Sequence, residues 1–224
     1  MQSYDIRNPE VLDLLERFRY FYTEKYDIPN VNKLGVDPTN SINNVHLLVD
    51  EPVDEYFVSD KFRDEIISMG RDHDGYPDSA RSWPLKPEHH IGDDPENYRK
   101  DFNQLDADMR ILLGIQQCAL SQLYPPKGYI SWHSNANAAG FNLIFTWSET
   151  GDGWFKYIDK YGKEITIKDK KGWSLKAGYF GTYDEDKVCY HAAHTKCWRI
   201  TVSYIVTRHE EDFWKDCIEF ITES

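Results

Sequence analysis

The feature that most constrains the fold of this chain is a two-residue apolar repeat in its second half. Across residues 141–148, the sequence Phe-Asn-Leu-Ile-Phe-Thr-Trp-Ser places an aromatic or leucine side chain at every second position. Successive side chains of a strand point to opposite faces of its sheet. The alternation therefore predicts a strand with one face in an apolar core.

Comparable short runs extend from Tyr129 to Val206, separated by turns rich in glycine and charged residues. They lie at residues 154–158, 165–167, 173–175, 179–182, 188–190 and 199–206. About eight short strands with such turns predict a double-sheet jelly roll or a barrel.

Helical patterns precede these strands. Asn8, followed by proline and glutamate, is typical of a helix start, and the apolar spacing after it predicts a helix over residues 9–25. Asp60 is expected to cap a second helix that ends near Met69. Two more helices are predicted at residues 106–123, before a Pro-Pro pair, and at 213–221, and a short strand at 45–49.

The long polar segment at residues 70–101 is rich in proline and glycine and contains His73, His89 and His90. Loops of such length in compact domains are usually functional. We predict either a plain surface loop or a cover over the mouth of an active site.

No repeat, low-complexity segment or domain boundary divides the chain. Helices first and strands afterwards are typical of an α+β domain. We predict one domain over residues 1–224, with a helical and loop part at 1–104, a jelly-roll core with its supporting helix at 105–206, and a C-terminal helix at 207–224. The N-terminal helices are expected to pack on one sheet.

The net charge of −12 limits the kinds of partner. Sequence-independent binding of nucleic acid depends on lysine and arginine contacts with phosphates, so duplex nucleic acid is disfavoured. A local group of lysines is predicted to form the solvated face of a hairpin; it comprises Lys163, Lys168, Lys170, Lys171 and Lys176.

The sequence predicts neither a transmembrane helix nor a signal peptide, because no run of 18 apolar residues occurs and the N-terminus has no apolar segment. Cys118, Cys189, Cys197 and Cys217 are scattered. Reduced thiols in a cytoplasmic protein are therefore expected, with Cys118 in the core of the helix at 106–123.

Three residues of the strand region form a candidate site: His133, His191 and Arg199. A non-haem iron centre needs two imidazoles and usually one carboxylate on one face of the metal. Ligands two residues apart on a strand end project to the same side, whereas the second imidazole must come from a distant strand. An arginine deeper in the fold can hold a carboxylate by two parallel hydrogen bonds.

This pattern resembles that of the Fe(II)- and 2-oxoglutarate-dependent oxygenase superfamily, which has His-x-Asp/Glu, a distal His, and an Arg or Lys about ten residues further on. His133 matches the first histidine, His191 the distal one and Arg199 the cosubstrate-binding cation. The likeness covers roughly residues 105–206 and is closest to the small prolyl-hydroxylase-like branch, phage-type members included. It implies a double-stranded β-helix core, a jelly roll of the cupin kind.

The resemblance also implies roles for individual residues. Iron(II) would be bound by His133, Asn135 and His191, and 2-oxoglutarate by Arg199 with help from Thr201 and Tyr129. The enzyme would convert 2-oxoglutarate to succinate while it hydroxylates a C–H bond of a small molecule, an amino acid or a peptide side chain. Two alternatives are an inactive β-barrel binding protein and a metal-dependent cupin enzyme that does not use 2-oxoglutarate.

Asn135 is a departure from the motif, because it stands where the family has Asp or Glu. An amide oxygen can bind a metal, but it brings no charge. Four outcomes are open: Asn135 binds iron, a carboxylate such as Glu149 or Asp152 reaches in, two histidines suffice with water or an anion as in related halogenases, or the site is not catalytic.

His194 is the alternative distal ligand. It lies five residues before Arg199, whereas His191 lies eight residues before it, close to the family spacing. With Cys189 or Cys197 the two histidines could also mimic a zinc site. Strand flanks do not give the helical ligand geometry of a zincin, and no Cys-x-x-Cys occurs.

Overall fold

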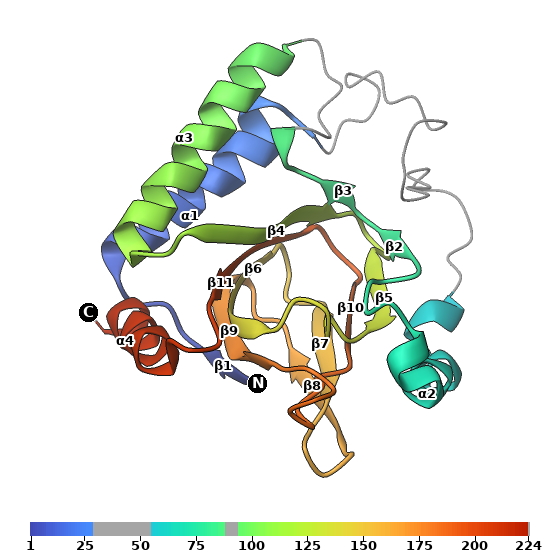
Figure 1. Ribbon diagram of the computed structural model, residues 1–224. Helices are drawn as coiled ribbons and strands as arrows, with labels where there is room; N and C mark the ends of the chain where they lie inside the picture. The colour runs from blue at the N-terminus through green and yellow to red at the C-terminus, as the bar shows by residue number, and fades with distance from the viewer. Residues whose placement is uncertain (29–54, 88–93, 224) are drawn as a thin grey trace.

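The computed structural model describes residues 1–28, 55–87 and 94–223. The strand predicted at 45–49, and His89 and His90, lie outside these ranges. Within them the chain forms helices and two antiparallel β-sheets that lie face to face (Figure 1).

The larger sheet has six strands in the order β1-β9-β6-β11-β4-β3. These strands are β1 (Gln2–Tyr4), β3 (Trp83–Pro84), β4 (Gln117–Tyr124), β6 (Gly140–Ser148), β9 (Gly172–Phe180) and β11 (Arg199–Val206). The strand predicted from the alternation at 141–148 is confirmed, and it pairs with β9 and β11 over its length.

The smaller sheet has five strands in the order β2-β5-β10-β7-β8. They are β2 (Ala80–Arg81), β5 (Tyr129–His133), β7 (Gly153–Ile158), β8 (Glu164–Lys168) and β10 (His191–Thr195). From β4 to β11 the chain changes sheet at every connection except the β7–β8 hairpin. This path brings β5 and β10, which are far apart in sequence, side by side.

The inner faces of the two sheets share one apolar cluster. Its buried members come from both sheets and are Tyr124, Ile130, Ile144, Phe155, Phe180, Cys189 and Ala193. Side chains that alternate with these point outwards, so each strand has a defined inner and outer face.

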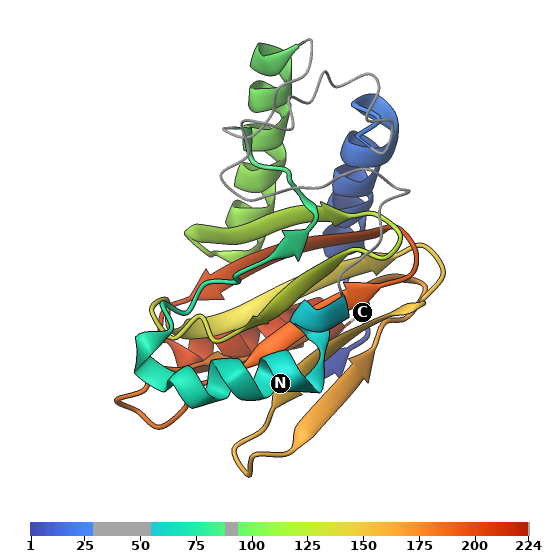
Figure 2. The same cartoon turned by 90° about the vertical axis from the view of Figure 1, so that its right-hand side faces the viewer.

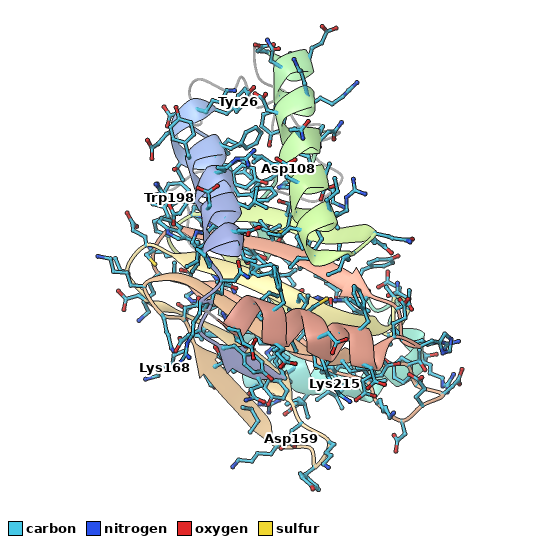
Figure 3. The ribbon with its side chains drawn as sticks, turned by 90° about the vertical axis from the view of Figure 1, so that its left-hand side faces the viewer. Tyr26, Asp108, Asp159, Lys168, Trp198 and Lys215 are labelled. Carbon is cyan, nitrogen blue, oxygen red and sulfur yellow. The ribbon has the colours of Figure 1, made fainter. Side chains whose placement is uncertain are left out.

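Helices cover the outer faces. α1 (Pro9–Tyr20), which continues as the π-helical turn η1 (Phe21–Lys25), α3 (Pro95–Leu113) and α4 (Glu211–Thr222) pack on the six-stranded sheet. Figure 3 views this side, with α1 and α3 upright and α4 across the sheet. α2 (Asp60–Met69) and the 3-10 turn η3 (Glu55–Val58) cover the five-stranded sheet (Figure 2, foreground).

The helix predicted at residues 9–25 is confirmed. The Asn8 side chain accepts hydrogen bonds from the backbone N–H groups of Glu10 and Val11, at 3.0 and 3.3 Å, which satisfies donors that the first turn leaves free. α4 confirms the predicted terminal helix. α2 is also present, but its N-cap is Ser59 rather than Asp60, because the Ser59 hydroxyl accepts from the N–H of Phe62.

The helix predicted at residues 106–123 is wrong in both boundaries. α3 begins at Pro95, where the Asp94 side chain accepts from the N–H of Asn97, and it ends at Gly114, whose φ of 68° closes the last turn. Residues 117–124, including Cys118, form the strand β4 instead. Leu120 and Leu123 lie three residues apart and continue the helical spacing past Gly114, so periodicity alone did not find the break.

The N-terminal part also contributes strands, because β1, β2 and β3 all lie within residues 1–104. The segment predicted as one long loop at 70–101 contains β2, β3 and the start of α3. The strand predicted at 188–190 is wrong, since β10 begins at His191.

All four cysteines are free thiols. In the described ranges, no helix combines the length and the apolar character that a bilayer crossing requires.

Candidate functional site

His133 and His191 meet at one end of the five-stranded sheet. His133 is the last residue of β5, His191 is the first of β10, and the two are direct cross-strand partners. Their ring centroids lie 4.1 Å apart. The rings of Phe155 and Phe180 stack on His191, with centroids at 5.5 and 4.3 Å, so the pair lies on the inner face.

A β-bulge in β5 turns His133 to this face. Ile130 pairs with Ala193, and the register then shifts before His133 pairs with His191. Ile130 belongs to the inner cluster, whereas Trp132 packs in the outer cluster under α2. The extra residue lets His133 follow Trp132 and still point inwards, a known use of bulges beside functional sites.

Both imidazoles are held in the tautomer that suits a metal ligand. Nδ1 of His133 donates to the carbonyl oxygen of Ser131 and Nδ1 of His191 to that of Cys189, each at 2.7 Å. A carbonyl only accepts, so Nε2 of each ring keeps its lone pair. Burial lowers the pKa of His133 to about 4 and also lowers that of His191, so both rings are neutral at neutral pH.

The spacing of the two rings is close to that expected for one shared metal ion. Two imidazoles bound at about 2.1 Å to neighbouring positions of a metal place their ring centroids roughly 4.6 to 5.3 Å apart. The observed separation of 4.1 Å is about 0.5 Å shorter than the lower end of that range. The pair supplies two neutral nitrogen ligands that suit a divalent transition metal.

Asn135 contributes a polar side chain beside this pair. Its Nδ2 lies 3.3 Å from Nε2 of His191, where the amide donates to the free lone pair. Asn135 has a φ of 50°, a left-handed conformation that Asn and Asp tolerate better than most residues, and its N–H donates to the carbonyl of Gly75. A rotation of the amide about its last bond would present Oδ1 in place of Nδ2.

The candidate carboxylates Glu149 and Asp152 lie at the opposite end of the sheet. β10 pairs His191 with Tyr157 but Thr195 with Gly153, four residues away along β7, which is roughly 13 Å at the usual rise of a strand. Glu149 accepts from the N–H of Trp198. Among the described residues, no three His, Cys, Asp or Glu side chains form a group that could hold a metal ion.

His194 and Tyr129 lie on the outer face. They are cross-strand partners, and the His194 ring stacks on Trp154 at 5.6 Å. Tyr129 stacks on Phe57 and shares a hydrogen bond of 2.8 Å with Ser79. The structure therefore separates both residues from the His133–His191 pair, and it does not bring Tyr129 to Arg199 and Thr201.

Sequence reasoning did not single out His73 as part of the site. Its side chain is buried, and its Nδ1 accepts a hydrogen bond from the N–H of Gly75 at 3.0 Å. The Gly75 carbonyl in turn accepts from the N–H of Asn135. The only sequence signal was its place in a polar segment that was predicted either to cover a site or to be a plain loop.

Arg199 lies in a buried charge cluster on the inner face. Its Nε donates to Oδ2 of Asp169 at 3.0 Å, and Nη1 donates to the Thr201 hydroxyl at 2.8 Å. Lys176 donates to the other oxygen, Oδ1 of Asp169, at 2.8 Å. The side chains of Lys176 and Asp169 are 0% exposed and that of Arg199 is 2% exposed.

This cluster corrects one prediction and adds one residue. Lys176 was predicted on a solvated hairpin face, but it is fully buried on β9 because it pairs with Asp169; Lys163, Lys168, Lys170 and Lys171 are exposed. Asp169 had no sequence signal beyond its place next to those lysines. Burial raises its pKa, but Arg199 and Lys176 outweigh that effect and hold the pKa below its usual value.

Gly153 is required where β7 passes this cluster. A Cβ at Gly153 would overlap the carboxylate of Asp169. The backbone N–H of Asp169 also donates to the carbonyl of Gly153 at 2.9 Å, so the two residues are held close together. Gly153→Ala should therefore lower the free energy of unfolding by about 1–3 kcal/mol in urea titrations. A free energy of unfolding equal to that of the wild type would contradict the close approach.

Comparisons with known proteins gave structural likenesses only. Models of protein families and curated proteins gave no match. A prolyl-4-hydroxylase from Pseudomonas putida is 16% identical, with 52% of this chain and 68% of that chain covered and a TM-score of 0.31. A prolyl hydroxylase from Trichoplax adhaerens, solved with a peptide fragment of hypoxia inducible factor, is 11% identical, with 90% and 95% covered and a TM-score of 0.33.

A cupin-like protein from Thermotoga maritima is 13% identical, with 43% of this chain and 69% of that chain covered and a TM-score of 0.20. None of these three TM-scores reaches 0.5. The function is therefore inferred below from the geometry of the site.

Proposed function

We propose that this protein is an Fe(II)- and 2-oxoglutarate-dependent oxygenase of the hydroxylase type. Strands β4 to β11 would be its jelly-roll, or double-stranded β-helix, core. The observation that carries the proposal is the pairing of His133 with His191 on the inner face, each with Nδ1–H on a backbone carbonyl and an unprotonated Nε2. Such carbonyl-oriented histidines are typical of metal ligands.

The two histidines would hold the metal, with Asn135 Oδ1 or a solvent molecule as a further ligand. A bound iron(II) ion supplies the activation of oxygen and the coordination of a keto acid. The backbone carbonyls of Ser131 and Cys189 fix both rings, so the ligands are oriented before the metal arrives. Phe155 and Phe180 keep bulk water from one side of His191.

Arg199 would bind the remote carboxylate of 2-oxoglutarate, and Thr201 would hold the guanidinium in place through its hydrogen bond to Nη1. Arginine suits this role because it is always charged and its planar group can pair with both carboxylate oxygens. The substrate would be a small molecule, an amino acid or a peptide side chain that approaches from the His133–His191 end and loses hydrogen from a C–H bond.

The proposal is tested by anaerobic titration of the full chain with iron(II) and 2-oxoglutarate. A weak visible charge-transfer band should form in the wild type and in His194→Ala, since His194 lies on the outer face. The band should be absent in His191→Ala. Absence of the band in the wild type, or its persistence in His191→Ala, would refute the assignment.

A second candidate, a binding protein without catalysis, is favoured by one observation. Within the described ranges, no carboxylate accompanies the two histidines, so nothing of the chain offsets the charge of a divalent ion there. Release of succinate from 2-oxoglutarate in the presence of iron(II) and oxygen decides between them, because a binding protein gives none. A cupin enzyme that does not use the keto acid would keep its metal chemistry in Arg199→Gln.

A further inference from the structure

The cluster of Arg199, Asp169 and Lys176 carries one more positive charge than it can neutralise internally. It joins two cations to one carboxylate with almost no exposure to solvent. Within the described ranges, no second acidic side chain forms an ion pair with either cation. An uncompensated buried charge is unfavourable unless an anion is bound beside it.

The cluster also has hydrogen-bond donors to spare. The ammonium of Lys176 has three N–H groups, and in the part of the chain that the structure describes Asp169 is its one acceptor. The hydroxyl of Thr146, a residue that is 1% exposed, has no hydrogen-bond partner among the described residues. Buried polar groups in native proteins nearly always have partners, so these groups are available to an anionic ligand.

Thr146 lies between the two cations. Thr201, Thr146 and Ser174 form one cross-strand row on the inner face of the six-stranded sheet. Arg199 is two residues from Thr201 along β11, and Lys176 is two residues from Ser174 along β9, in the opposite direction. A row of hydroxyl groups is thus flanked by a guanidinium and an ammonium.

The cluster lies on the same inner face as the histidine pair, further along β9. Phe180, which stacks on His191, is four residues after Lys176 on the same strand and the same face. Phe180 and Ile144, the cross-strand partner of Lys176, belong to the apolar cluster between the sheets. A ligand with one charged end at the cluster and the other at the histidines would therefore cross an apolar middle.

We propose that Lys176, Arg199 and Thr146 together bind one carboxylate of a dicarboxylate ligand, and that Asp169 is a positioning residue that holds the two cations apart. The assignment rests on the proposed function, in which that ligand is the keto-acid cosubstrate. The assignment goes beyond the proposed function in the residues that it names. The sequence resemblance assigns the carboxylate to Arg199 with Thr201 and Tyr129. It gives no role to Lys176, Thr146 or Asp169.

The test is the binding of glutarate to the metal-free full chain, measured by calorimetry. Glutarate has both carboxylates but no keto group, so its binding does not require iron. Lys176→Met should weaken binding at least about tenfold and Thr146→Val about three- to tenfold. Thr146→Val is the cleaner variant, because a hydroxyl without a partner can be removed with little effect on folding. Lys156→Met, which removes a lysine paired with Glu164, is the control and should bind as the wild type does.

The pH dependence supplies a second readout. Burial lowers the pKa of Lys176 to about 8; Asp169 opposes this shift and Arg199 adds to it. The other groups at the cluster are constant between pH 8 and 9.5, because Arg199 stays charged, the pKa of Asp169 is lowered and that of Tyr124 is raised to about 12. Glutarate affinity should therefore fall over this range in the wild type, by up to about tenfold per pH unit, and stay flat in Lys176→Met.

The outcomes separate this inference from the proposed function. Glutarate binding that is unchanged in both Lys176→Met and Thr146→Val, or no binding to the wild type, overturns the carboxylate site even if iron-dependent succinate release is observed. Binding that depends on both residues, without succinate release, supports the site and refutes the oxygenase.

Discussion

An Asp169→Asn variant should lose about 3–5 kcal/mol of unfolding free energy. The neutral amide would leave the guanidinium of Arg199 and the ammonium of Lys176 facing each other with no counter-ion and almost no solvent. Breaking a buried ion pair by removal of one partner is costly because the remaining charge stays desolvated. For a chain of this size, the loss corresponds to a fall in melting temperature of roughly 6–20 °C.

Thermal and urea unfolding of Asp169→Asn measure this loss, and Asp5→Asn is the matched control. Asp5 also pairs with a lysine, Lys170, but both side chains are largely exposed, at 63% and 60%. Exposed pairs of this kind contribute about 0–1 kcal/mol. A loss in Asp169→Asn no larger than that in Asp5→Asn would show that water or another anion reaches the cluster.

A second substitution should recover part of the lost stability. Lys176→Met in the Asp169→Asn background returns the cluster to a single positive charge, so the double variant should be more stable than Asp169→Asn alone. Lys176→Met by itself leaves a neutral Arg199–Asp169 pair, and its stability should not fall below that of the wild type by more than about 1 kcal/mol. This non-additivity measures the coupling of the two side chains.

The strand region could be predicted from the sequence because one period dominates it. Residues 141–148 alternate over their full length, and the turns around them contain glycine. The break between α3 and β4 could not be predicted from periodicity, since Leu120 and Leu123 continue the helical spacing beyond the left-handed Gly114. The bulge that turns His133 inwards depends on pairing between β5 and β10, which no local pattern contains.

The residues of the site could be predicted only where their types and their spacing along the sequence form a recognisable pattern. Two distant histidines and a following arginine were recognisable as a set, and β5, β10 and β11 place all three on inner faces. Lys176 looked like its exposed neighbours, because a sequence does not show which of several lysines on adjacent strands meets a buried carboxylate. The orphaned hydroxyl of Thr146 is a property of the packed sheet alone.

Asn135→Asp should raise the affinity for iron(II) at least about tenfold, because it adds a charged oxygen beside two neutral imidazoles. Aspartate tolerates the left-handed backbone at this position nearly as well as asparagine does. Without metal, the same substitution should lower the stability of the protein. It loses the hydrogen bond from Nδ2 to Nε2 of His191, so its unfolding free energy should fall by about 1 kcal/mol.

A gain in iron(II) affinity together with a loss of stability in the metal-free protein would distinguish a ligand position from a general charge effect. Asn137→Asp is the matched control, since it adds the same charge two residues away on an exposed side chain. Its effect on metal affinity should be small and should vanish in high salt, because charges in water are screened. Asn135→Asp should keep its gain in high salt, as a direct bond to the metal is not screened. If both variants respond alike, Asn135 does not face the metal, and the third ligand must be solvent or an anion.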